Sequence, residues 1–277
     1  LSKITALSGV VPQIAVVNGI CGGMSATAVS MFDVIVATEG SSFYVNPPFV
    51  LKNLGLKNAG SIALAAKNGL VDIVCPDSAG ALAKARELVA LLPQNNAQGF
   101  AYCDSGDDDN RRTPEIVGCE DTLSLIAAIA DGGRFIPLKS DFAAEMLTGF
   151  APIGGVVTGI VATGHGRTLT PKGARKASGF ISFCDNFMIP VVTLVDTDGI
   201  DISADAENAA YAPELARLAA AYSASTNTKV TAIVGKAYGA AYTLLGSKAV
   251  GADVVLATEN AEISVMAPDA AVQFMYG

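Results

Sequence analysis

The sequence has few of the side chains from which metal sites and side-chain catalysts are usually built. Its 277 residues contain a single histidine, His165, and the cysteines are odd in number, with no CxxC pair. These features argue against a zinc site and a disulfide framework, so no metal is expected. The cysteines are expected to be reduced, mostly buried thiols of a cytoplasmic protein. They are Cys21, Cys75, Cys103, Cys119 and Cys184.

Excess positive charge and long apolar runs are also missing, and the segment that starts at Leu1 is not expected to be a secretion signal. The net charge of −8 argues against a partner bound through its phosphates, so no nucleic acid is expected. No apolar run approaches the roughly 20 residues of a membrane-spanning helix, and the start has no basic segment. The chain begins without Met and stops at QFMYG, inside an expected helix, which suggests part of a longer protein.

Known catalytic fingerprints are absent as well. The sequence has no GxSxG nucleophile elbow, no GxxxxGK[ST] phosphate loop and no GxGxxG dinucleotide fingerprint after a strand. His165 is a candidate base, although a loop histidine between two glycines is usually only solvated. Asp196 and Asp198 either pair as carboxylates or form a polar turn. A cysteine nucleophile would need His165 as its partner, and a structural role is favoured for the thiols.

What the sequence does contain is an internal repeat. DVIVATE at residues 33–39 returns as DVVLATE at residues 253–259. Each copy follows a β-branched run, at residues 14–17 and 230–234, then a group of small residues and a helix-like stretch. The shared unit of strand, small-residue turn, helix and strand indicates a duplication. The stretch from the small residues to the aspartate is three residues longer in the second copy, so the helices or turns differ in length.

The small residues at the helix starts carry the chemistry that the sequence permits. Gly22 and Gly23 in the first copy, and Gly239, Ala240 and Ala241 in the second, would let a ligand approach the backbone closely. The first amides of a helix have no internal acceptor, and two of them aimed at one oxygen form an oxyanion hole. A phosphate cradle and simple close packing of the helix are the alternatives.

Outside the repeat, alternating apolar runs and helical periodicity favour an α/β fold. A polar, acidic stretch at residues 94–114 is predicted to link two similar domains. The other expected elements are helices at residues 79–92, 122–131 and 172–187, a hairpin at 154–164, and a buried strand at 189–199 that ends in a polar turn at 196–199.

Several longer stretches are specific to one family. VPQIAVVNGICGGMSA, FCDNFMIP and KAYGAAY occur in this order among matching segments that cover most of the chain. In these segments the chain resembles the carboxyltransferase component of biotin-dependent acyl-CoA carboxylases and decarboxylases, of the crotonase superfamily. The resemblance implies two tandem crotonase-like (ClpP/crotonase) domains of ββα units. Residues 1–114 would form the acyl-CoA side and residues 115–277 the carboxybiotin side, each incomplete at its outer end.

The resemblance also implies a reaction that needs no catalytic histidine. A carboxyl group passes between carboxybiotin, on a separate carrier protein, and the α-carbon of a short acyl-CoA such as acetyl- or propionyl-CoA. Biotin acts as the base, and backbone amides hold the two oxyanions. By motif, Gly22 and Gly23 would hold the thioester oxygen, and Ala240 and Ala241 the ureido oxygen. Substrate contacts are expected from Met24, Tyr238, Gly239, Tyr242 and Thr243.

The implied partners are a biotin carboxyl carrier protein and a biotin carboxylase or decarboxylase subunit, and the implied assembly is a homodimer or a hexamer built from dimers. The chain departs from the family pattern at Leu64, Pro152, Asp198, Ala240 and Thr243. These departures leave open the acyl chain length and the role of a scaffold that has lost turnover. Hydratase or isomerase chemistry would need a carboxylate base beside the thioester, and the first copy offers no clear candidate.

Overall fold

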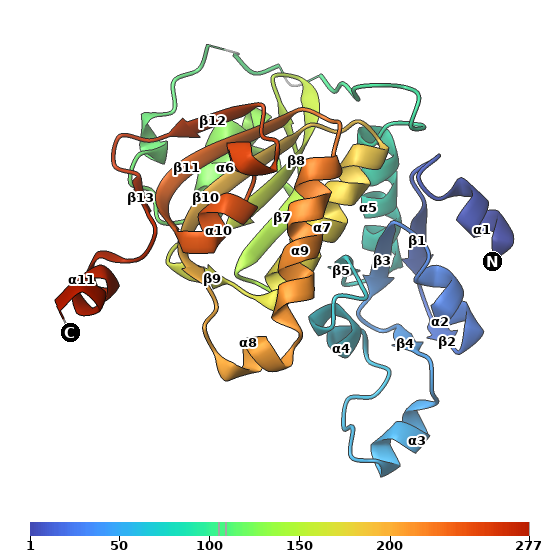
Figure 1. Cartoon of the computed structure of the whole chain (residues 1–277). Helices are drawn as coiled ribbons and strands as arrows, with labels where there is room; N and C mark the ends of the chain where they lie inside the picture. The colour runs from blue at the N-terminus through green and yellow to red at the C-terminus, as the bar shows by residue number, and fades with distance from the viewer. Residues whose placement is uncertain (105, 109, 277) are drawn as a thin grey trace. The chain divides into compact units, whose positions relative to one another are not determined.

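The computed structural model describes residues 1–104, 106–108 and 110–276 (Figure 1). The chain divides into two compact units. Unit 1 comprises Leu1–Ala101 with Pro137–Phe142, and unit 2 comprises Tyr102–Ile136 with Ala143–Gly277. The sequence predicts a boundary after residue 114, whereas the units divide after Ala101. Residues 137–142 join unit 1, where the Lys139 amide donates to the Asp72 carbonyl at 2.8 Å.

Unit 1 is built on a parallel sheet with strand order β1-β3-β5, and β2 and β4 form a separate parallel pair. β3 is buried along its whole length, as expected for a parallel strand covered on both faces. The helix predicted at residues 79–92 is α5, which is capped by the Asp77 carboxylate. The elements are α1 (Ser2–Leu7), β1 (Ile14–Val17), β2 (Ile20–Gly22), α2 (Met24–Val29), β3 (Val34–Thr38), β4 (Ser42–Tyr44), α3 (Pro48–Asn53), α4 (Ile62–Lys67), β5 (Ile73–Cys75) and α5 (Ser78–Leu91).

Unit 2 is built on a larger sheet with strand order β12-β11-β10-β8-β7-β6, to which β13 adds beside β11 and β9 beside β10. Its elements are η1 (Pro114–Ile116), α6 (Thr122–Ile129), η2 (Asp131–Gly133), β6 (Ile136–Leu138), β7 (Met146–Ile153), β8 (Val156–Thr163), β9 (Arg167–Leu169), α7 (Pro171–Asn186), β10 (Val191–Ile200), α8 (Ala204–Asn208), α9 (Tyr211–Ala224), β11 (Lys229–Tyr238), α10 (Gly239–Leu244), η3 (Lys248–Val250), β12 (Val254–Ala257), β13 (Glu262–Ser264) and α11 (Pro268–Tyr276).

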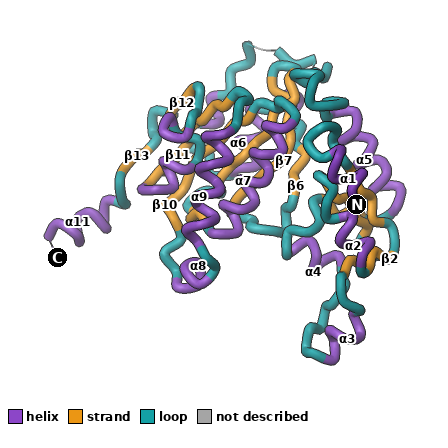
Figure 2. The backbone as a smooth tube through the Cα atoms, turned by 45° about the vertical axis from the view of Figure 1, so that its right-hand side comes forward, coloured by secondary structure: helices purple, strands orange, loops and turns teal. Residues whose placement is uncertain are grey.

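The sheet of unit 2 has helices on both faces, and β8 shows how they pack. Gly159 and Ile160 point to opposite faces because strand side chains alternate. A Cβ at Gly159 would lie 2.6 Å from the sulfur of Cys184, so α7 packs directly on this strand. Ile160 belongs instead to a core cluster with Ile126 of α6. Helices α7 and α9 lie side by side over one face of the sheet (Figures 1 and 2).

The hairpin predicted at residues 154–164 is confirmed as the antiparallel pair β7–β8. Gly154 and Gly155 form its turn with φ values of +57° and +73°, a region that glycine adopts at little cost. Both amides donate to the carboxylate of Asp131, at 3.0 and 2.7 Å. The helices predicted at residues 122–131 and 172–187 are also present, as α6 and α7.

The two copies of the repeat are built alike. β1 pairs in parallel with β3, and β11 pairs in parallel with β12. At the entrance of each copy, the amide of Gln13 donates to Asp33, and the amide of Lys229 donates to Asp253, both at 2.7 Å. The two partners are 20 residues apart in the first copy and 24 in the second. The additional residues of the second copy include the 3₁₀ turn η3.

Two strand ends differ from the prediction. The strand predicted at residues 230–234 does not stop there, because β11 continues to Tyr238 after a bend at Gly235. The polar turn predicted at residues 196–199 lies inside β10, where Asp196 and Thr197 are buried. In both places a neighbouring strand provides hydrogen bonds that polar residues would otherwise take from water.

Two further findings concern the described part of the chain. None of its helices is both long and apolar enough to cross a membrane. No group of three His, Cys, Asp or Glu side chains among the described residues is arranged to hold a metal ion. All five cysteines are free thiols.

Candidate active site

Each copy of the repeat places a glycine between a strand and a helix. Gly23 follows β2 and caps α2, with φ of +59° and ψ of −127°. Gly239 follows β11, opens α10 and has the same φ of +59°. A side chain with a Cβ is strained in this region, which explains a glycine at both positions. The matched pairs are therefore Gly23 with Gly239, and Met24 with Ala240.

The first amides after the glycine of α2 have no acceptor in their own helix. The earliest bond of the helix runs from the Thr27 amide to the Gly23 carbonyl at 3.3 Å, so the amides of Met24 and Ser25 precede it. The amide of Gly23 itself donates to the Tyr44 carbonyl at 2.9 Å. The predicted donor Gly23 is therefore already occupied, and the outward-pointing donors lie one and two residues further along the chain.

The first turn leaves room for a ligand beside the backbone, whereas in the second turn a Cβ at Gly239 would lie 3.2 Å from the Val265 carbonyl oxygen. Met24 and Ala240 are exposed. A Cβ built at Gly23 would have no described atom within 4 Å, so the space beside this residue is open. Gly22 is different, because a Cβ there would lie 2.6 Å from the Tyr44 ring. Gly22 is thus required for packing.

The predicted residues of α10 lie at different depths. Ala241 is fully buried, Tyr242 is half-buried and Thr243 is exposed. Tyr238, just before the turn, is buried, and its hydroxyl donates to the Glu262 carboxylate at 2.5 Å. This hydrogen bond raises the pKa of Tyr238 to about 12, so the phenol stays protonated near neutral pH. The contact ties the end of β11 to β13.

In the first copy, neutral groups hold the bend that precedes the turn. The bend is at Gly19, whose amide donates to the Ser41 hydroxyl at 2.8 Å. The Ser41 hydroxyl donates in turn to the Val17 carbonyl at 3.0 Å and lies 2.6 Å from the Thr38 hydroxyl. Hydroxyls and backbone groups thus satisfy one another at this position.

In the second copy, a buried carboxylate occupies the matching position. Gly235 corresponds to Gly19, and a Cβ at Gly235 would lie 2.4 Å from the carboxylate carbon of Asp196. The next amide, that of Lys236, donates to Asp196 Oδ1 at 2.9 Å. The Asp196 amide donates to the Thr163 hydroxyl at 2.7 Å, which fixes the backbone that carries the carboxylate. Asp196 therefore fills the bend of β11.

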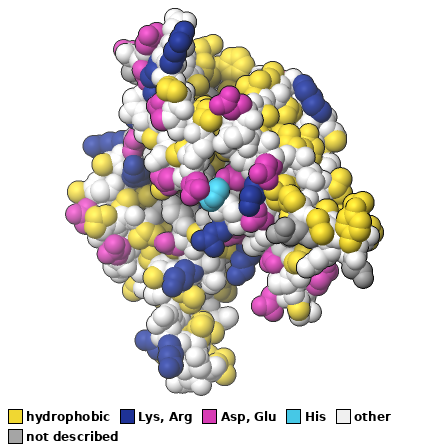
Figure 3. Space-filling view, turned by 90° about the vertical axis from the view of Figure 1, so that its left-hand side faces the viewer, with side chains coloured by type: hydrophobic (Ala, Val, Ile, Leu, Met, Phe, Trp, Pro, Cys, Tyr) yellow, Lys and Arg dark blue, Asp and Glu magenta, His cyan; other side chains and the backbone are white. Residues whose placement is uncertain are grey.

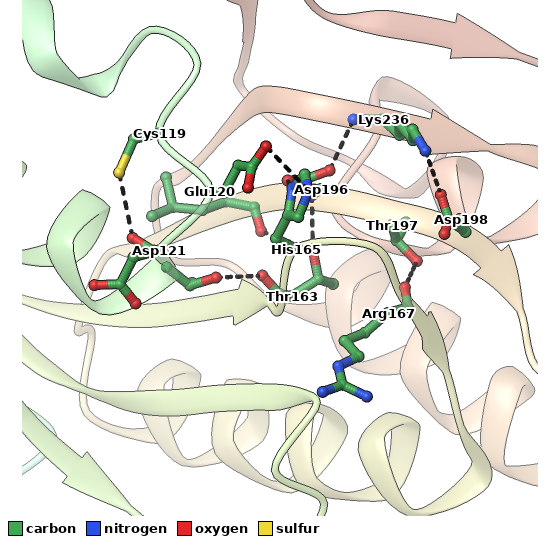
Figure 4. A network of polar contacts seen from close by, with 12 residues as sticks. Cys119, Glu120, Asp121, Thr163, His165, Arg167, Asp196, Thr197, Asp198 and Lys236 are labelled. Atoms are coloured by element: carbon green, nitrogen blue, oxygen red, sulfur yellow. Dashed lines mark hydrogen bonds and ion pairs between the residues drawn. The ribbon is translucent and has the colours of Figure 1, made fainter.

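The only histidine contacts this carboxylate. His165 lies in a tight turn between β8 and β9, closed by the bond from the Arg167 amide to the Gly164 carbonyl at 3.0 Å. Its Nδ1 is 2.5 Å from Asp196 Oδ2, and its Nε2 is 3.9 Å from Glu120 (Figure 4). The hydrogen bond to Asp196 raises the pKa of His165 above its ordinary value of 6.5. The expectation of a merely solvated loop histidine is wrong.

Asp198, the other carboxylate considered from the sequence, has a different partner. Asp198 lies 3.2 Å from the Lys236 ammonium group, which raises the pKa of Lys236 (Figure 4). Asp196 contacts the imidazole of His165, and Asp198 contacts the ammonium group of Lys236. The carboxylate pair considered from the sequence is therefore not formed.

These side chains surround a small surface pocket. Figure 3 shows the histidine on this face of the molecule, next to acidic and basic side chains. The cavity has a volume of about 160 Å³. Its polar lining includes Glu120, His165, Asp196, Lys236, Asn260 and Glu262.

The sequence contained a signal for this cluster. His165 follows the carboxyl end of β8, and Asp196 lies in the carboxyl-terminal half of β10, which pairs with β8 in parallel. Polar residues at the carboxyl ends of adjacent parallel strands meet at one edge of the sheet. The register that brings them together depends on the strand order, which the sequence did not provide.

Comparisons with known proteins agree with the resemblance of the motifs. The family model of the carboxyl transferase domain matches residues 2–277. The methylmalonyl-CoA carboxyltransferase 12S subunit of Propionibacterium freudenreichii subsp. shermanii is 32% identical over 286 residues, which cover 98% of this chain and 55% of that protein. The methylmalonyl-CoA decarboxylase subunit alpha of Veillonella parvula is 30% identical, over 98% of this chain and 57% of that subunit.

A solved structure has the same fold. The transcarboxylase 12S crystal structure, a hexamer assembly with hydrolysed methylmalonyl-coenzyme A bound, matches with a TM-score of 0.92 and 30% identity. The match covers 99% of this chain and 58% of that chain. The present chain thus spans a little more than half the length of these relatives, and the predicted α/β fold of crotonase type is confirmed. With its repeat, its motifs and nearly its whole length in agreement, the chain belongs to the carboxyl transferase family.

Proposed function

We propose that the protein transfers a carboxyl group between biotin and the α-carbon of a short acyl-CoA. The observation that carries this proposal is the pair of matched turns. Each has a glycine at φ +59°, followed by an exposed residue whose amide has no acceptor within its own helix. A reaction with two oxyanions needs two such sets of donors.

The roles of the residues follow from the positions of the amides. In the first copy, the amides of Met24 and Ser25 hold the thioester oxygen, in place of Gly22 and Gly23, whose motif first suggested this site. In the second copy, the amides of Ala240 and Ala241 hold the ureido oxygen. Biotin supplies the carboxyl group and the base when it is bound. The chain itself supplies orientation and negative-charge stabilisation, so no side-chain base is needed.

Relatives that act on methylmalonyl-CoA support a short acyl group and a coenzyme A thioester as the substrate. By the same similarity, we propose a biotin carrier protein and a carboxylase or decarboxylase subunit as partners. The hexamer of the 12S protein supports a homo-oligomer, which we propose is built from dimers. The free thiols support a cytoplasmic location.

The test is carboxyl transfer from methylmalonyl-CoA or malonyl-CoA to free biotin by the complete natural protein. Substitutions Met24→Pro and Ala240→Pro remove the proposed N–H groups. Met24 is the first residue of α2 and Ala240 the second of α10, and the first turn of a helix accepts proline. Each is expected to lower kcat about 100-fold or more, as with other oxyanion-hole donors. Met24→Ala and Ala240→Ser keep the amides and serve as matched controls.

Two results would contradict the proposal. Absence of transfer by the intact wild-type oligomer would remove the activity itself. Transfer by Met24→Pro and Ala240→Pro at the rate of their controls would leave the activity but remove these amides from it.

A further inference from the structure

We propose that His165 and Asp196 are positioning residues for the turn at Gly239: Asp196 holds the bend of β11, and His165 holds Asp196. The inference rests on the proposed function, because the turn is where the biotin side of the reaction is placed. Neither residue is proposed to touch the substrate. Their role is to fix the strand that presents the amides of Ala240 and Ala241.

The register of β11 against β10 is irregular. Against β10, Val195 faces Ile233 while Thr197 faces Ala237, so residues 234–236 bulge opposite Asp196 alone. On its other side, β11 pairs with β12 up to Ile233 and with β13 from Lys236 onward. The bulge is thus the point at which β11 changes partner, and bulges of this kind redirect a strand.

The carboxylate of Asp196 fills the bulge. Asp196 is 4% exposed, and its carboxylate packs on the Cα of Gly235. It accepts the amide of Lys236, which begins the segment that pairs with β13. From Lys236 to Gly239 the chain advances only three residues, and Tyr238 between them is held by Glu262. A displacement at Lys236 is therefore passed directly to the turn.

His165 is the side-chain partner of the Asp196 carboxylate. A buried carboxylate is costly unless it is paired and hydrogen-bonded, and His165 provides the side-chain donor. The groups that face His165 are Asp196 of β10, Glu120 before α6, and Lys236 of β11. Cys119 and Glu262 line the same pocket. Lys236 is itself engaged by Asp198.

Protonation adds charge to the contact. Both forms of the ring donate Nδ1–H to the Asp196 carboxylate, but only the imidazolium form adds the attraction between two opposite charges to that hydrogen bond. Because the pKa of His165 is raised, the cationic form persists above pH 6.5 and is lost as the pH rises further. The hold on the bend is therefore firmer on the acidic side of this transition.

The experiment compares His165→Ala and His165→Asn with Ser41→Ala, which loosens the matching bend of the first copy. KM values for free biotin and for methylmalonyl-CoA are measured with the complete protein between about pH 6 and about pH 9. His165→Ala is expected to raise the KM for biotin about tenfold at low pH, and to leave that for methylmalonyl-CoA unchanged. His165→Asn keeps a neutral donor, so its KM for biotin should match the high-pH wild-type value at every pH. Ser41→Ala should raise only the KM for methylmalonyl-CoA.

Amide hydrogen exchange provides a readout that does not depend on activity. His165→Ala should speed exchange in residues 236–241 and leave residues 20–25 unchanged, and Ser41→Ala should do the reverse. If the wild type transfers carboxyl groups but His165→Ala changes neither the KM for biotin nor the exchange, the positioning role is wrong. If the wild type transfers nothing while the exchange responds as expected, the pair holds the turn and the proposed function is wrong.

Discussion

The two copies of the repeat solve one structural problem with different chemistry. Both must bend a strand at a glycine just before the turn that leads into a helix. The first copy holds the bend at Gly19 with the Ser41 and Thr38 hydroxyls. The second holds the bend at Gly235 with Asp196 and His165. Neutral groups hold the bend in the first copy, and ionisable groups hold it in the second.

The strand order explains the difference. β1 stands at the end of the order in its sheet, so the bend is completed by residues of the same copy. β11 lies between β10 and β12, and β10 brings a side chain from outside the repeat. Ala261 takes the place of Ser41 in the second copy and offers no hydroxyl. A duplicated unit can thus acquire pH sensitivity from a neighbouring strand while its own backbone pattern is kept.

The largest difference between the copies should appear when the side chain that holds each bend is removed. Asp196→Ala leaves the Lys236 amide and His165 without their acceptor, so a loss of about 3 kcal/mol in unfolding free energy is expected. Ser41→Ala removes neutral hydrogen bonds only, and about 1 kcal/mol is expected. Urea unfolding of the two variants beside the wild type measures both values.

Asp196→Asn is the matched control for this comparison, because it keeps the size and one acceptor for the Lys236 amide. Its loss should fall between those of the other two variants. Equal losses for Asp196→Ala and Ser41→Ala would mean that the charge of the second copy adds nothing to its stability.

A smaller effect should be visible in the pH dependence of the two copies. The pKa of His165 is raised above its unfolded value by the bond to Asp196, so its contribution to stability is fully present below about pH 6.5. It is lost as the pH rises through the higher pKa of the folded state. NMR titration follows the imidazole of His165, which is the only histidine in these 277 residues. Asp196→Asn should bring that pKa down, whereas Ser41→Ala should leave it in place.

The sequence allowed much of the fold to be predicted, and for identifiable reasons. The repeated heptad marked the matched strands β3 and β12, and apolar periodicity marked α6 and α7. The end of β11 was misplaced because Gly235 breaks the apolar run without ending the strand. Asp196 was assigned to a turn because a buried carboxylate inside a strand is uncommon, and only its partners make it acceptable.

The site residues remain a prediction. The sequence marked both small-residue turns and paired Gly22 and Gly23 with Ala240 and Ala241, whereas the backbone conformation pairs Gly23 with Gly239. Positive φ at Gly23 and Gly239 supplies the correct match, and φ cannot be read from a pair of adjacent glycines. His165 was noticed and set aside, since the contact with Asp196 depends on a strand order that no local pattern encodes.

The smallest expected effect concerns a position where the copies differ only in side-chain volume. Cys21 of β2 and Ala237 of β11 occupy matching positions in the two copies. Each stands one residue before the last paired residue of its strand, which is Gly22 in β2 and Tyr238 in β11. Both are buried, and burial raises the pKa of the Cys21 thiol, which makes the thiol a poor nucleophile. Cys21→Ala converts the first copy to the second at this point.

The loss of one buried sulfur should cost about 1 kcal/mol of unfolding free energy and leave carboxyl transfer unaffected. Urea unfolding and the transfer assay check both expectations. A loss several times larger would show that the first copy packs around the sulfur in a way the second does not, and the two turns would then differ in their support as well as in their charge. A loss of activity without a loss of stability would instead assign the thiol a part in the reaction, which its burial opposes.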